Sequence, residues 1–125
     1  MDRRDIRKAR APALFLMEIR VGETGTILTS SDGSTWVSRT SGTTNFLHGV
    51  SCGDNAFVAV GTSNTILSSA DNGTTWTTRT FATNEEIRST DYGNSIFVAV
   101  GLTGTIQAST GGTTWTAKTS GTTKD

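Results

Sequence analysis

The chain has 125 residues, enough for one ordinary domain with a modest core, and it carries 11 basic and 11 acidic side chains. The zero net charge argues against binding to nucleic acid or to an acidic membrane, and no apolar run reaches the roughly 18 residues that a membrane span requires. The single cysteine, Cys52, excludes an internal disulfide and leaves the cellular compartment undetermined.

The chain begins with a basic segment that precedes any regular pattern. Residues 1–20 carry six basic and three acidic side chains. The segment does not fit a signal peptide, because the apolar run at 13–17 is too short and the charged Glu18 ends it. Pro12 cannot donate a hydrogen bond to a strand ladder. Residues 1–12 are therefore predicted to be an irregular basic segment or an innermost strand, with a short helix or a disordered tail as further alternatives.

The rest of the chain is one unit repeated three times. Tryptophans stand at positions 36, 76 and 115, and FVAVG occurs at 57–61 and again at 97–101. Short runs of alternating apolar and polar residues, separated by Gly, Asn and Asp, predict strands joined by tight turns. The 25 threonines also favour strands over helices. Four strands in roughly 40 residues are typical of one β-propeller blade.

We therefore predict an all-β chain of three four-stranded antiparallel blades. Residues 13–40 form a first blade that is incomplete or atypical, 41–80 the second, 81–119 the third, and 120–125 a C-terminal tail. Propellers have roughly four to eight blades, so three blades leave two open faces that favour association. Head-to-tail pairing of two chains would close a six-bladed ring, and a homodimer is expected.

Each predicted blade contains a turn of similar composition, SSDGSTW at 30–36, SADNGTTW at 69–76 and STGGTTW at 109–115. In the second turn, Asp71 can accept hydrogen bonds from backbone amides and Gly73 can take a positive φ, and the outer strand is expected to begin at Thr75. Trp76 supplies the large apolar area that ties a blade to its neighbour.

These turns resemble the Asp-box, or BNR, repeat of sialidases, sortilin-type receptors and the photosystem II assembly factor family. The resemblance covers most of residues 21–119 and implies that the boxes are structural turns lying away from any catalytic centre. A cation or glycan site at Asp32 and Asp71 is the alternative. The box residues are Ser30, Asp32, Gly33, Thr35, Trp36, Ser69, Asp71, Gly73, Thr75, Trp76, Ser109, Gly112, Thr114 and Trp115.

The match to the repeat is complete only in the second box. The first box is one residue shorter between Ser30 and Trp36, although Asp32 is retained. The third has Gly111 where the acidic residue should stand, which predicts a less rigid third turn.

Basic residues recur three positions after each tryptophan, at Arg39, Arg79 and Lys118. They would stand around the circumference of a closed ring, on the outer strand of each blade. One interpretation is that they discourage pairing with a foreign strand. The alternative is an anion-binding rim.

Further candidate binding residues lie on the predicted innermost strands, where His48, Arg88 and Tyr92 can face the channel. His48 is interpreted as a ligand or general base, or as a polar residue lining a wet channel. Sialidase chemistry needs arginines with a tyrosine and an acid, but alternation places Asp91 on the face opposite Arg88 and Tyr92. A pocket would also need long insertions, so no catalytic residue, metal site or cofactor is predicted.

Two functions therefore remain. The first is a non-catalytic propeller, a binding or scaffold module that presents a face or channel to a protein or glycan partner. The second is a structural fragment of a repeat array, which has no ligand of its own and is held together by self-association. A sialidase-like glycan enzyme is a minor alternative to these two.

Overall fold

The computed structural model describes residues 7–10, 18–53, 56–71, 73–79, 86–118 and 121, of which 7–10 and 18 are described by their backbone alone. The predicted C-terminal tail lies outside the described residues apart from Gly121, and so does Pro12 in the N-terminal segment.

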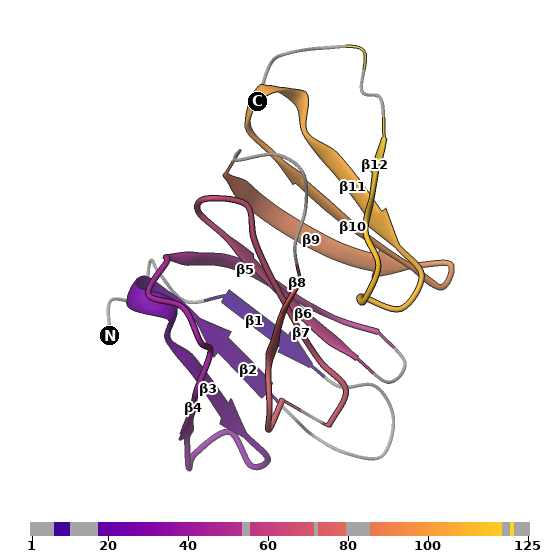
Figure 1. Cartoon of the computed structure of the whole chain (residues 1–125). Coiled ribbons are helices and arrows are strands. Elements are labelled where there is room, and N and C mark those ends of the chain that lie inside the picture. Colours follow the sequence, from indigo (N-terminus) through magenta and orange to yellow (C-terminus); the bar gives the residue numbers. More distant parts are fainter. Residues whose placement is uncertain are drawn as a thin grey trace.

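The described chain folds into three sheets, each of four antiparallel strands in chain order (Figure 1). The all-β prediction with three four-stranded sheets is confirmed. The first sheet contains β1 (Arg7–Arg10), β2 (Glu18–Val21), β3 (Ile27–Ser30) and β4 (Val37–Arg39). The second contains β5 (Leu47–Cys52), β6 (Phe57–Gly61), β7 (Thr65–Ser69) and β8 (Thr77–Arg79). The third contains β9 (Ile87–Gly93), β10 (Ile96–Gly101), β11 (Ile106–Ser109) and β12 (Thr116–Lys118).

Tight turns with positive φ join the strands within each sheet. Asn94 and Ser95, with φ of 50° and 64°, form the two-residue connection between β9 and β10. Two positive φ values in succession match the right-handed twist of the strands on either side. Short 3₁₀ turns, η2 (Glu23–Gly25) and η3 (Leu102–Gly104), occupy the connections after β2 and β10.

The outer strand of the second sheet begins later than the sequence predicts. Strand β8 starts at Thr77 and not at Thr75. The amide of Thr75 donates to Asp71, and the indole of Trp76 donates to the carbonyl of Gly73, so both residues close the preceding turn. Their hydrogen-bonding groups are committed to that turn before the ladder begins.

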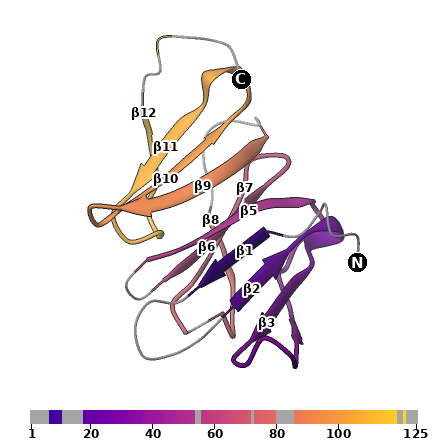
Figure 2. The same ribbon diagram turned by 180° about the vertical axis from the view of Figure 1, so that it is seen from behind.

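The three sheets pack face against face, with the innermost strands β1, β5 and β9 side by side (Figures 1 and 2). Gly49 in β5 permits the close approach of β9, because a Cβ at Gly49 would lie 3.3 Å from the Cα of Ser89. The strands β4, β8 and β12 form the opposite edges of the three sheets. The result is the wedge-like arrangement of consecutive propeller blades.

Two apolar layers hold the sheets together. Strand β6 contributes to both layers and is buried along its whole length. The layer between the first and second sheets contains Ile19, Val21, Ile27, Leu47, Val50, Phe57, Ala59 and Leu67. The layer between the second and third sheets contains Val58, Val60, Ile66, Ile87, Phe97, Ala99 and Trp115.

A matched pair of glycine substitutions tests this packing. Gly112 and Gly42 have φ of 81° and 83°, so Gly→Ala at either position should cost about 1 to 2 kcal/mol of unfolding free energy. A Cβ at Gly112 would also lie 3.0 Å from Cγ2 of Val58 on the second sheet, whereas nothing lies within 4 Å of a Cβ at Gly42. We expect Gly112→Ala to lose at least ~1 kcal/mol more than Gly42→Ala in urea denaturation. Equal losses would contradict the close contact between these sheets.

Candidate functional site

The three box turns, 30–36, 69–76 and 109–115, share a serine-to-glycine hydrogen bond. In each turn the serine hydroxyl accepts from the amide of a glycine with positive φ, which fixes the start of the turn. The donors Gly33, Gly73 and Gly112 lie 2.8, 2.9 and 2.8 Å from the hydroxyls of Ser30, Ser69 and Ser109.

The same glycines bring each later turn against the preceding sheet. A Cβ at Gly73 would lie 3.1 Å from Cγ2 of Thr29 and 3.3 Å from Cδ1 of Ile19, both in the first sheet. The indole Nε1 of Trp76 donates to the Gly73 carbonyl over 2.8 Å, and its ring packs on the first apolar layer. The box turn therefore packs its glycine and tryptophan against the preceding sheet.

The carboxylates of the first two boxes are held by their own turns. Asp71 accepts from the Thr75 hydroxyl and also from the Thr75 amide over 2.8 Å, and these bonds lower its pKa to about 2. Asp32 accepts from the amides of Thr35 and Ser34 over 2.7 and 2.8 Å, and the Thr35 amide is the main cause of its lowered pKa. These contacts favour the structural interpretation of both residues.

The third box lacks this carboxylate but keeps the other contacts. Gly111 stands in the acidic position, while the indole of Trp115 still donates to Gly112 over 3.0 Å. Thr114 remains exposed. The lower rigidity expected for this turn stays a prediction.

The three basic residues of the outer strands differ in their contacts. Nε of Arg39 donates to the Thr29 hydroxyl over 2.9 Å, and Nε of Arg79 donates to the Ser68 hydroxyl over 2.8 Å. Lys118 occupies the equivalent place in β12 and is exposed. Each residue belongs to a different sheet, so the structure does not gather them into one site.

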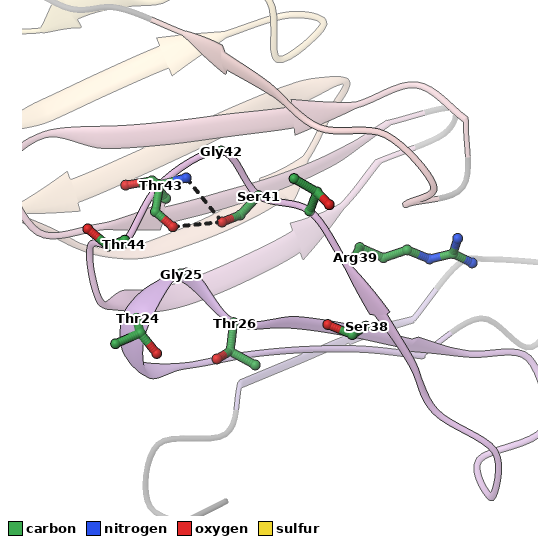
Figure 3. Close-up of a pocket in the computed structure, with 10 residues that line it drawn as sticks. Thr24, Gly25, Thr26, Ser38, Arg39, Ser41, Gly42, Thr43 and Thr44 are labelled. Carbon is green, nitrogen blue, oxygen red and sulfur yellow. Dashed lines mark hydrogen bonds between the residues drawn. The ribbon is translucent and has the colours of Figure 1, made fainter.

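A hydroxyl-rich pocket lies beside Arg39 (Figure 3). The hydroxyl of Ser41 donates to the carbonyl of Thr43 over 3.0 Å and orders the segment that leads to the second sheet. Arg39 extends away from these groups, so no charged side chain enters the hydroxyl-lined part of the pocket in this view. The lining residues are Thr24, Gly25, Thr26, Ser38, Arg39, Thr40, Ser41, Gly42, Thr43 and Thr44.

A charged cluster joins the innermost strands of the second and third sheets. Nε2 of His48 lies 3.3 Å from Oε1 of Glu86, and Nε of Arg88 donates to Oε2 of Glu86 over 2.7 Å. The bond from Arg88 is the largest cause of the lowered pKa of Glu86. The Phe46 ring stacks on His48 with centroids 4.5 Å apart.

His48 and Arg88 stand at equivalent irregularities in their ladders. Residues Leu47 and Gly49 pair with consecutive residues of β6, which leaves His48 out of the register. Ile87 and Ser89 pair with consecutive residues of β10 and leave out Arg88 in the same way. Bulges of this kind redirect a side chain away from the regular alternation of a strand.

The bulge separates Arg88 from Asp91 and Tyr92, the other residues considered for sialidase chemistry. Alternation along β9 is interrupted at Arg88, which contacts Glu86. The Tyr92 ring packs on Phe97 with centroids 4.6 Å apart, and Asp91 accepts from the Tyr92 amide. Sequence reasoning missed Glu86, because its contact with His48 spans 38 residues of chain, although the spacing of Glu86 and Arg88 was a usable signal.

In the described part of the chain, no group of three His, Cys, Asp or Glu side chains could hold a metal ion. No helix there is long and apolar enough to cross a membrane.

Comparisons with solved structures identify the fold. YCF48 bound to D1 peptide superposes with a TM-score of 0.76 at 22% sequence identity, covering 90% of this chain and 40% of that one. YCF48 from Cyanidioschyzon merolae gives a TM-score of 0.75 at 20% identity, covering 92% of this chain and 41% of that one. The chain has a β-propeller fold and spans about two fifths of the length of these structures.

No family model matches the chain, and no curated protein matches it.

Restoring the missing carboxylate should stabilise the third box turn. A Cβ at Gly111 would meet nothing within 4 Å, and its φ is not in the left-handed region. Gly111→Asp should raise the unfolding free energy by about 1 kcal/mol or more, because the carboxylate can accept from following amides as Asp32 does. Gly111→Ala is the control, because it only lowers the conformational entropy of the unfolded chain. That effect should raise the unfolding free energy by about 0.4 to 1 kcal/mol. If urea denaturation ranks Asp no higher than Ala, the carboxylate is not what the box requires.

Acid should weaken the second box turn selectively. The pKa of Asp71 falls from an ordinary 3.8 to about 2 in the folded chain, so its ionised form stabilises folding fully above pH 3.8. This stability is lost as the pH falls from 3.8 towards 2. We expect the urea midpoint of Asp71→Asn to fall less over this range than that of the wild type. Asp91→Asn controls for the loss of one exposed negative charge, and an identical fall in all three chains contradicts the assignment.

Proposed function

We propose that the chain is a non-catalytic β-propeller module that binds a protein partner at the inner-strand cluster of His48, Glu86 and Arg88. The paired bulges are the observation that carries the proposal. Two consecutive blades leave the equivalent residue out of the ladder, and both residues contact one carboxylate. Such a repeated departure from regular strand geometry is typical of binding and catalytic positions.

The chemistry of the cluster suits a carboxylate on the partner. The Arg88 side chain is 60% exposed, and Glu86 holds it through Nε, so the outer edge of the guanidinium remains available for a bidentate contact. His48 adds a second donor beside it, since a histidine ring nitrogen can donate or accept. An acidic segment of a protein is the expected ligand.

The comparisons support a protein partner over a glycan. A solved propeller of similar fold is YCF48 bound to D1 peptide, so this fold accommodates a peptide in at least one protein. The hydroxyl-rich pocket beside Arg39 offers no aromatic platform among its lining residues, which makes it a weaker glycan candidate. We assign no catalytic role to the cluster, because Arg88 contacts Glu86 while Tyr92 packs on Phe97.

The second candidate function is a structural one. Here the chain is a fragment of a repeat array with no ligand of its own, and the three Asp-box-like blades are held together by self-association. The exposed valines of β10 favour association, and we propose that two chains pair head to tail and close a six-bladed ring.

Peptide binding separates the two functions. A fluorescein-labelled peptide rich in glutamate should bind the wild-type chain in an anisotropy titration, and the same peptide with glutamine should bind more weakly. We expect Arg88→Ala to weaken binding about tenfold, or 1.4 kcal/mol, because it removes a charge-assisted contact. Arg79→Ala removes an equal charge on an outer strand and should have little effect. Equal affinity for both peptides, or equal losses in both variants, would favour the structural function.

A further inference from the structure

The same five residues, FVAVG, form β6 and the last five positions of β10, but they meet different surroundings. In β6 both valines, Val58 and Val60, are fully buried against the third sheet. In β10 Phe97 and Ala99 are buried, whereas Val98 and Val100 are 37% and 40% exposed. Ile96 beside them is 40% exposed. The outward face of the third sheet thus carries the same valines as a filled face, but no sheet among the described residues covers it. We term Ile96, Val98 and Val100 the socket.

The structure shows what fills the equivalent face in the two closed interfaces. In the first sheet, Ile19 stands where Val58 and Val98 stand in the others, and the turn glycine Gly73 seats against it with Trp76 alongside. In the second sheet, Val58 receives Gly112, and Trp115 completes the layer. Each filled socket therefore holds the glycine and tryptophan of a box turn from the following blade.

The first blade carries the same turn with no sheet to receive it among the described residues. Gly33 has φ of 75° and donates to Ser30, as the glycines of the seated turns do to their serines. The Arg20 guanidinium instead lies 4.3 Å from the centre of the Trp36 ring. Nε of Arg20 is buried and has no hydrogen-bond partner in the described part of the chain. We term Gly33 and Trp36 the plug.

Arg20 distinguishes this plug from the seated ones. In the second and third sheets the equivalent strand position holds Ala59 and Ala99, both fully buried against the preceding sheet. The guanidinium over Trp36 supplies a cation–π contact that covers part of the ring in a single chain. Docking of the plug therefore competes with this contact.

We propose that the socket of one chain receives the plug of a second copy. The proposal deepens the self-association proposed above and rests on it. The occupant is a second copy because the chain itself carries the matching turn, built like the two turns already seated within it. Each copy supplies one plug and one socket, so two chains form two equivalent seams and leave neither element uncovered.

Sedimentation over a range of concentrations tests the seam. The wild-type chain should pass from the mass of one chain to twice that mass as the concentration rises. Val98→Asp should weaken the dimer at least tenfold, because it places a charge in the apolar socket. The matched control is Val37→Asp, because Val37 is also exposed, at 45%. Val37 pairs with Thr29, which faces the second sheet, so it lies on the face of the first sheet opposite the plug. Equal weakening by both variants overturns the proposal.

A gain of association gives a test that a folding defect cannot imitate. Arg20→Ala places in the first blade the residue that the other blades carry, and it frees the Trp36 ring. We expect the dimer to tighten by about fivefold to thirtyfold, because each of its two seams then forms without breaking an exposed cation–π contact. An unchanged or weaker dimer contradicts the role given to this pair.

Mixing two defective chains distinguishes head-to-tail seams from any other dimer. Val98→Asp lacks a working socket, and Trp36→Ala lacks a working plug. A mixed pair holds one intact seam and one seam that is defective on both sides, whereas each variant alone has two impaired seams. The mixture should therefore associate more tightly than either variant alone, and the absence of this gain overturns the proposal.

The association of two chains can be tested independently of peptide binding. Arg88→Ala should leave the dimer unchanged, and Val98→Asp should leave the affinity for the glutamate-rich peptide unchanged. A wild-type chain that stays single at every concentration overturns the seam while the peptide titration still stands, and the socket is then left to a blade from another protein.

Discussion

Face-to-face packing between consecutive sheets is the interaction on which this molecule depends. A four-stranded sheet of this size has no core of its own, so its apolar faces must be covered by neighbours. The second sheet satisfies this requirement on both sides, and every residue of β6 is buried as a result. Among the described residues, the first and third sheets are each covered on one face only. The turn contacts between sheets and the position of the inner strands both derive from this requirement.

The box turns separate two tasks that a single residue could not perform. The serine and the aspartate organise the backbone locally, and the aspartates stay exposed. The glycine and the tryptophan make the contacts with the preceding sheet. This separation explains why the third turn keeps its packing without an acid, because Gly112 and Trp115 reach the second sheet regardless of what stands at Gly111.

The strands could be predicted from the sequence because their periodicity is local, and the box turns because their composition repeats. The start of β8 lies later than propensity predicts, since the turn uses the hydrogen bonds of Thr75 and Trp76 and propensity does not reveal that use. The bulges were not predictable in the same way. Alternation tells which residues share a face but not which residue leaves the ladder, and His48 and Arg88 do so where β5 and β9 lie side by side. The contact of Glu86 with His48 depends on the same approach.

The repeated pentapeptide shows where local information ends. Phe97 and Ala99 are as buried as Phe57 and Ala59, because each pair faces the preceding sheet in the same chain. The valines point to the opposite face of each strand. Val58 and Val60 pack against the third sheet, whereas no described sheet covers Val98 and Val100. The inner-strand cluster does not depend on that side, since His48 and Glu86 meet across an interface that is already closed. The proposed ligand site and the proposed seam between chains therefore rest on different faces, although both depend on the same stacked sheets.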